Sequence, residues 1–310
     1  MTDVIVVGSV NIDFTNYLID WPRVGETVNT QETKISLGGK GANQSVAASN
    51  LGCAVTMIGA VGDDSFGQDA KRALQKSNIS LQFEPLADIS TGLAFIDVVS
   101  DGSNVIRIAA GANNYLTAAH IDKHAALFAA AKVILLQNEI PLVASLAAAR
   151  LGRENGALVV MDPAPAPSER WPARTHSAFD ILTPNAEEVH VLLGEKPATL
   201  EDALGAAKAV RNLGARGAIV TMGEKGVAWA LPSSSGKLAA PKVTSVDTVA
   251  AGDCFNGALA TAYVDHLPDE EAIRFAMLAA ALTTTKKGAS EAIPIKEDVL
   301  AMKWHEPQIS

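Results

Sequence analysis

The chain has 310 residues, of which 48% are hydrophobic and 5% aromatic, a composition typical of a globular protein and not of a disordered or fibrous one. Its formal net charge of −9 argues against nucleic acid or an anionic membrane as the main partner. A nucleotide is still compatible with this charge, because backbone N–H groups and Mg²⁺ can hold phosphates.

The cysteine content and the apolar runs indicate where the protein works. Cys53 and Cys254 are isolated and form no CxxC pair, which predicts a reducing, cytoplasmic environment without disulfides. The first residues, MTDVIVVGSV, lack a basic n-region and are read as a strand, not a signal peptide. No apolar run has the length of a membrane span.

Short apolar runs alternate with helical patterns along the chain. Buried strands are expected at residues 4–10, 54–61, 133–137, 157–162, 180–185 and 217–223. Helices are expected at residues 40–52, 64–78, 141–156 and 200–215. This alternation predicts an α/β fold in which helices cover both faces of a mostly parallel sheet, and ligands bind beyond the carboxyl ends of its strands.

Two segments depart from this pattern. Residues 12–37 and 91–109 alternate apolar and polar side chains and are rich in β-branched residues, and the second contains a DGSN turn. We expect them to form a small β-sheet lid inserted into a single domain that spans residues 1–310. Because such a lid would expose an apolar face, we expect two lids to pair in a homodimer.

Polar residues that could bind a sugar lie near the N-terminus. Asn11 and Asp13, in VNID, share one face at the expected end of the first strand, or they are simply strand-end turn residues. The stretch LGGKGANQ follows, in which glycines permit close backbone approach before a helix and Lys40 and Asn43 supply donors. The stretch lacks the GxxxxGK[ST] spacing of a P-loop and is otherwise read as a plain turn.

Two later stretches are candidates for nucleotide binding. In TPNAEE, Asn185 and Glu188 are three residues apart: they form a capping box, or they bind a nucleotide phosphate and the water shell of Mg²⁺. In VTMGEKG, a strand ends at Thr221, and Gly223 and Gly226 frame a turn that suits a phosphate or ribose over backbone, or a plain hairpin turn.

The stretch VDTVAAGDCFNGALA contains one acid, Asp253, after three small residues at an expected helix start. Unpaired N–H groups and the positive end of the helix dipole suit an anion there. Asp253 is therefore either a plain N-cap of the helix or a carboxylate with a functional role beside a bound anion.

Taken together in this order, GGKGANQS, NAEE, TMGEKG and DTVAAGD resemble the signatures of the ribokinase family of sugar kinases, the phosphofructokinase-B type, over essentially the whole chain. The resemblance implies a ribokinase-like three-layer α/β/α fold and transfer of a phosphoryl group from ATP, with Mg²⁺, to O5 of D-ribose. Deoxyribose, another sugar or a nucleoside is the alternative substrate, and a non-catalytic sensor is the alternative class.

The resemblance also implies roles for individual residues. Asp253 is expected to be the general base, and Ala250, Ala251 and Gly252 the anion hole. The expected sugar site comprises Asn11, Asp13, Gly39, Lys40, Gly41, Asn43, Glu139 and Asp253. The expected ATP site comprises Asn185, Thr221, Gly223, Gly226, Gly252 and Met277.

For metals, the resemblance implies Mg²⁺ held through water by Glu188 and a monovalent cation, K⁺, as activator. The cation ligands are expected among Asp247, Val249, Thr283, Lys286 and Gly288. The family often has serine where this chain has Ala292, so one cation ligand is absent here.

Overall fold

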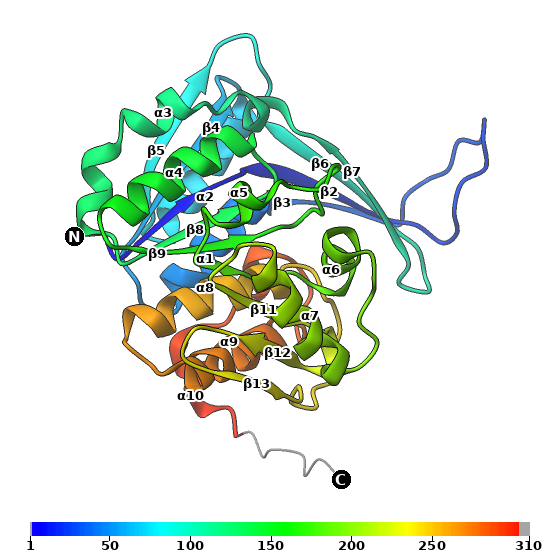
Figure 1. Cartoon of the computed structure of the whole chain (residues 1–310). Coiled ribbons are helices and arrows are strands. Elements are labelled where there is room, and N and C mark those ends of the chain that lie inside the picture. Colours follow the sequence, from blue (N-terminus) through cyan, green and yellow to red (C-terminus); the bar gives the residue numbers. More distant parts are fainter. Residues whose placement is uncertain (1, 304–310) are drawn as a thin grey trace.

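The computed structural model describes residues 2–303 and contains two sheets (Figure 1). The larger sheet has the strand order β13-β12-β11-β10-β9-β8-β1-β4-β5. Its strands are β1 (Val4–Val7), β4 (Val55–Gly62), β5 (Ser80–Leu86), β8 (Val133–Gln137), β9 (Leu158–Asp162), β10 (Ile181–Leu182), β11 (Gly217–Thr221), β12 (Val227–Ala230) and β13 (Ser235–Leu238). All neighbouring strands are parallel except β12, which is antiparallel to both its neighbours.

Helices cover both faces of this sheet. They are α1 (Lys40–Asn50), α2 (Ser65–Lys76), α3 (Ala118–Asp122), α4 (Leu142–Glu154), α5 (Ala173–His176), α6 (Ala186–Leu193), α7 (Leu200–Asn212), α8 (Ala251–Val264), α9 (Asp269–Thr283) and α10 (Lys296–Ala301). On β1, Val4 and Val6 pack in one core with α1, α8 and α9, whereas Ile5 and Val7 pack in a second core with α4 and α7. Both faces of the strand are therefore buried, which is why it is apolar throughout and why the predicted three-layer fold is confirmed.

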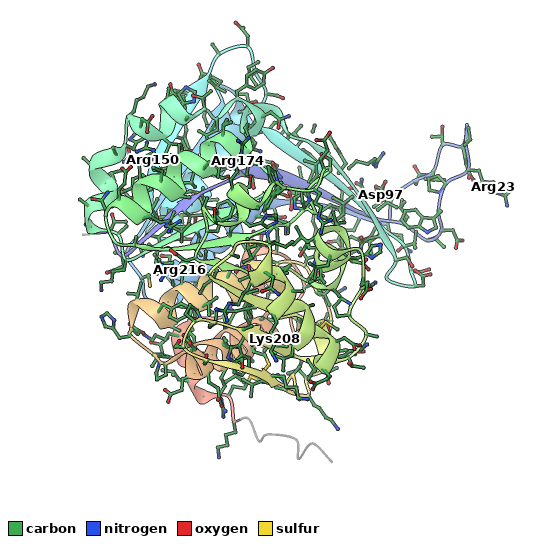
Figure 2. The ribbon with its side chains drawn as sticks, viewed as in Figure 1. Arg23, Asp97, Arg150, Arg174, Lys208 and Arg216 are labelled. Atoms are coloured by element: carbon green, nitrogen blue, oxygen red, sulfur yellow. The ribbon has the colours of Figure 1, made fainter. Side chains whose placement is uncertain are left out.

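The smaller sheet projects from the side of the body (Figure 1). Its order is β3-β2-β6-β7, with β2 (Asn11–Tyr17), β3 (Glu32–Gly38), β6 (Gly92–Val98) and β7 (Asn104–Ala109). The two predicted segments supply these strands as antiparallel pairs, and β2 and β6 join the pairs in parallel. Side chains of this sheet include Asp97, and Arg23 lies at the tip of the projecting loop (Figure 2).

Two differences from the predicted boundaries bear on the site. Residues 18–31 form an irregular loop and not strand, exposed except at Leu18, because Pro22 lacks a backbone donor and Gly25 has a φ of 83°. The first strand ends at Val7 and not at residue 10, and the chain leaves the large sheet before Asn11 begins β2. Asn11 and Asp13 therefore belong to the small sheet.

Within residues 2–303, no helix is both long enough and apolar enough to cross a bilayer.

Candidate active site

A carboxylate from the segment that follows β8 binds the start of α1. Gly39 precedes the helix with a φ of 87°, and a Cβ there would lie 2.8 Å from the backbone N of Asn11. Glu139, two residues after β8, accepts hydrogen bonds from Lys40 N at 3.0 Å and from Ser9 Oγ at 2.5 Å. An acid thus occupies the positive end of the helix, and this contact brings Glu139 next to Gly39 and Lys40, three residues of the predicted sugar site.

Asp13 is a buried carboxyl group with no donor of its own. It is 7% exposed, and its Oδ1 is sealed from solvent without a hydrogen-bond partner among the described residues. Burial, and then the charges of Glu139, Asp253 and Glu291, raise its pKa to about 7. A Cβ on Gly38 would lie 2.0 Å from this carboxyl, so a glycine is required beside it. A buried, unpaired acceptor suits hydroxyl donors of a polar ligand.

Asp253 is held by two amides from α1. Asn43 Nδ2 donates to its Oδ2 at 3.0 Å, and Gln44 Nε2 donates to its Oδ1 at 3.2 Å. Gln44 Nε2 also reaches Asp162 Oδ2 at 3.1 Å, while Gln44 Oε1 accepts from Gln137 Nε2 at 2.7 Å. The base predicted from the sequence is therefore buried, 5% exposed, and fixed in orientation.

The charges around Asp253 are partly balanced. Burial raises the pKa of Asp162 well above its ordinary value. Burial alone would lower the pKa of Lys40, but Asp253, Asp162 and the other nearby carboxylates outweigh this effect and raise it. Lys40 is therefore a positive charge facing this acidic group.

The start of α8 presents open backbone donors. Ala250 precedes the helix in the left-handed region, with a φ of 61°, and within residues 2–303 no acceptor is bonded to the N–H of Gly252 or Asp253. Gly252 is exposed, and a Cβ built on it would meet nothing within 4 Å. Free N–H groups at the positive end of a helix of 14 residues suit an anion.

The predicted nucleotide residues lie at the ends of neighbouring strands. Asn185 caps α6 and forms the capping box with Glu188, whose oxygens accept from Asn185 N at 2.6 Å and Asn185 Nδ2 at 2.8 Å. Asn185 also pairs with Thr221 in a short parallel bridge. Gly223 and Gly226 frame the turn after Thr221 with φ values of 56° and 122°. The capping box predicted for NAEE is thus confirmed. The side-chain amide of Asn185 and the turn after Thr221 lie at the same edge of the sheet.

The fit of these residues to Mg²⁺ is limited to contact through water. Both oxygens of Glu188 are already engaged, and burial raises its pKa. In the described part of the chain, no group of three or more His, Cys, Asp or Glu side chains could hold a metal ion. This donor set suits an ion that keeps its waters and is carried by phosphates.

Met277, expected at the adenine edge where it could offer only packing, is a buried residue. Its side chain lies on α9, is 6% exposed and belongs to the core that contains α1 and α8. Packing, not polar recognition, explains this residue.

The predicted cation residues lie in the loop before α8 and, from Thr283 onward, at the end of α9 and in the loop that follows it. Asp247 accepts from Val249 N at 3.0 Å and from Gly288 N at 3.1 Å, so its carboxylate ties both loops together. The carbonyl of Thr283 accepts from Lys286 N at 3.3 Å. Ala292 is buried and presents only a methyl group.

Several residues in this region were not predicted from the sequence. They are Ser9, Gln44, Asn113, Gln137 and Asp162. A signal existed for Gln44, which follows Asn43 in the same helix, and for Asp162, which ends a strand. Nothing in the local pattern around Asn113 or Gln137 points to a site, because their partners are distant in the sequence.

The fold, the buried acid at a helix start and the open backbone donors define a class. The model of the pfkB family carbohydrate kinases matches residues 1–296, and the chain belongs to this family. It is therefore a carbohydrate kinase.

Within this family, the chain is similar to kinases of ribose and deoxyribose. The chain is 36% identical over 301 residues to the ribokinase of Haemophilus influenzae, covering 97% of this chain and 98% of that protein. It is also 36% identical over 293 residues to the deoxyribokinase of Salmonella typhi, covering 94% and 95%. The structure of Arabidopsis thaliana ribokinase complexed with ribose and ATP superimposes with a TM-score of 0.89 at 31% identity, covering 96% of this chain and 97% of that one.

Proposed function

We propose that this chain is an ATP-dependent ribokinase, which transfers the γ-phosphoryl group of ATP to O5 of D-ribose and yields ribose 5-phosphate and ADP. One observation carries the proposal. The buried carboxylate of Asp253 is fixed by Asn43 and Gln44 at the start of a helix where the N–H groups of Gly252 and Asp253 have no acceptor among residues 2–303.

In this mechanism, Asp253 accepts the proton of the sugar's 5-hydroxyl group as O5 forms its bond to the γ-phosphorus. The bond from that phosphorus to the bridging oxygen breaks, and the electron pair leaves with ADP. The backbone N–H groups of Ala250, Ala251 and Gly252 are proposed to stabilise the charge spread over the transferred group. The N–H of Ala251 donates to Thr248 O at 3.3 Å without ligand, so it would have to exchange this bond for one to the phosphoryl group. A positioned base contributes about 10²–10⁴ in rate.

Asn185 and the turn from Thr221 to Gly226 hold the nucleotide, since both lie at the ends of neighbouring strands and Thr183, two residues before Asn185, donates to Asn256 Oδ1 in the second turn of α8 at 2.8 Å. Bound Mg²⁺ would neutralise phosphate charge, and Glu188 would contact only its water shell. The loops joined by Asp247 supply carbonyl oxygens for K⁺, without a ligand from Ala292.

The substrate assignment depends on Asn11 and Asp13. The unpaired carboxyl of Asp13 requires hydroxyl donors, and the two residues together suit vicinal hydroxyls of ribose. A 2-deoxy sugar would leave a buried acceptor unpaired, at a cost of about 1–3 kcal/mol. This favours ribose over deoxyribose by roughly ten- to a hundredfold, although relatives of both names are 36% identical to this chain.

The small sheet is proposed to close over the sugar and to pair with a second copy. Phe14 stacks on Phe95 at 5.6 Å and meets Phe66 of the body edge-on at 5.7 Å, so Phe14 is half-buried, whereas Phe95 remains 37% exposed. Ile106 and Ile108 of β7 are also exposed, and these side chains would be covered in a homodimer. Sedimentation of a monomer at micromolar concentration would contradict the dimer.

A substrate panel tests the activity. Coupled ADP-release assays on ribose, 2-deoxyribose, hexoses and adenosine should give the highest kcat/KM for ribose. A higher value for 2-deoxyribose or adenosine would overturn the substrate assignment. Asp253→Asn should abolish turnover while ATP binding by calorimetry is retained. A sensor without catalysis would show no turnover in the wild type either.

A further inference from the structure

Asn113 contacts Asn11 of the predicted sugar site and makes three hydrogen bonds. It belongs to a short 3₁₀ helix, Gly111–Tyr115, that follows β7, and it is 1% exposed. Its Oδ1 accepts from Val10 N at 2.9 Å. Its Nδ2 donates to Val10 O at 3.0 Å and to Asn11 Oδ1 at 2.8 Å.

The directions of these hydrogen bonds are fixed by the backbone. The N–H of Val10 can only donate and its carbonyl can only accept, so the amide of Asn113 has one possible orientation. Its Nδ2 must then face Asn11, which places Oδ1 of Asn11 toward Asn113. The Nδ2 of Asn11 is left as the group available to a ligand, since it has no acceptor within the described chain.

Two glycines permit this close contact. Gly92 of β6 is paired with Asn11 in the small sheet, and a Cβ on Gly92 would lie 2.2 Å from Asn11 Oδ1 and 2.4 Å from Asn113 Nδ2. Gly111 has a φ of 51°, and a Cβ there would lie 2.3 Å from Ser90 O. The backbone is therefore shaped so that the amide of Asn113 reaches under β2.

We infer that Asn113 is a positioning residue that makes Asn11 a hydrogen-bond donor toward the sugar. The inference rests on the proposed function. Asn11 and Asp13 are two residues apart on β2 and share a face, so one hydroxyl can contact both. A hydroxyl has a single proton; when Asp13 accepts it, the neighbouring group must donate to the oxygen's lone pair. An Asn11 amide turned the other way would place two acceptors against the same hydroxyl.

Asn113→Asp tests this role. The new carboxyl still accepts from Val10 N, but it has an oxygen where Nδ2 stood and cannot donate to Asn11. Even when protonated, its one proton is taken by Val10 O. Asn11 should then rotate its amide, and KM for ribose should rise about tenfold to a hundredfold. The KM for ATP should be unchanged, and kcat should change by less than about threefold, because Asp253 and the start of α8 are untouched.

A double-mutant cycle separates this effect from general damage. In the Asn11→Ala background, Asn113→Asp should change KM for ribose by no more than about twofold, because the residue through which it acts is gone. The full rise in that background would overturn the inference. If the Asn113→Asp protein does not fold, Asn113→Ser gives the same cycle, since its hydroxyl is too short to reach Asn11 from the same backbone.

Failure of the proposed ribokinase function can be distinguished from failure of the inference about Asn113. A wild type that prefers another sugar would overturn the ribose assignment, and the same cycle with the preferred sugar would still decide the role of Asn113.

Discussion

Replacing Asp13 by Asn should stabilise the unliganded protein while removing ribose binding. The carboxyl is buried and has no hydrogen-bond donor among residues 2–303, and its pKa is raised to about 7 by burial and by Glu139, Asp253 and Glu291. Asn has nearly the same shape, can keep its oxygen at the sealed Oδ1 position and carries no charge. The variant thus removes the unfavourable free energy of a buried carboxylate charge that the unliganded folded chain does not compensate.

The size and pH dependence of this cost follow from the pKa. Because the folded value of about 7 lies above the ordinary 3.8, the folded chain binds the proton more tightly, and stability is lost as the pH rises through this window. Each pH unit is worth 1.36 kcal/mol, so the cost is about 2 kcal/mol at pH 5 and about 4 kcal/mol above pH 7. The advantage of Asn should therefore grow by roughly 2–3 kcal/mol between pH 5 and pH 8.

Urea unfolding of both proteins at pH 5 and pH 8, without ligand, measures this difference. Asp64→Asn is the matched control. Although burial alone would raise the pKa of Asp64, hydrogen bonds from Thr91 and Gly67 lower it, so this variant should be destabilised at neutral pH. A stabilisation by Asp13→Asn that is equal at both pH values, or a loss of stability at pH 8, would refute the reasoning.

Three further outcomes are expected. Gly252→Ala should raise the free energy of unfolding by about 0.5–1 kcal/mol, because alanine favours the helix and its Cβ meets nothing within 4 Å. The same methyl group should lower kcat, because it obstructs the exposed start of α8 where the phosphoryl group is proposed to bind. An unchanged kcat would refute the anion site. Gln44→Leu should lower kcat by about tenfold or more with little change in KM for ATP, because Asp253 and Asp162 lose their shared donor; wild-type kcat would contradict that role. Gly38→Ala should weaken ribose binding at least tenfold by calorimetry, since its Cβ would overlap the Asp13 carboxyl, and normal affinity would mean that the small sheet shifts freely.

Much of the fold was predictable because its signals are local. The apolar runs of β1, β4, β8, β9 and β11 need only neighbouring residues to indicate buried strands. The predicted hairpin segments also held, apart from the loop at residues 18–31. The edge strands β5 and β13 were not predicted, because Pro85 and Gly236 interrupt their patterns.

The site was predictable as a set of residues, not as an arrangement. Asn185 shows the limit: its capping box lies within four residues and follows from the sequence, whereas its bridge to Thr221 does not. Met277 was expected near adenine as a packing residue, and only the structure shows that it is buried in the core that contains α1 and α8.

The sequence by itself determined the order of the motifs, the strand and helix pattern, and the presence of an acid among small residues at a helix start. Only the tertiary structure decided that Asn43, 210 residues away, holds that acid, that Asp13 has no donor, and that Asn113 orients Asn11. The reason is physical: periodicity and capping depend on neighbours along the chain, whereas the direction of a buried hydrogen bond depends on which distant groups the packed core brings within about 3 Å.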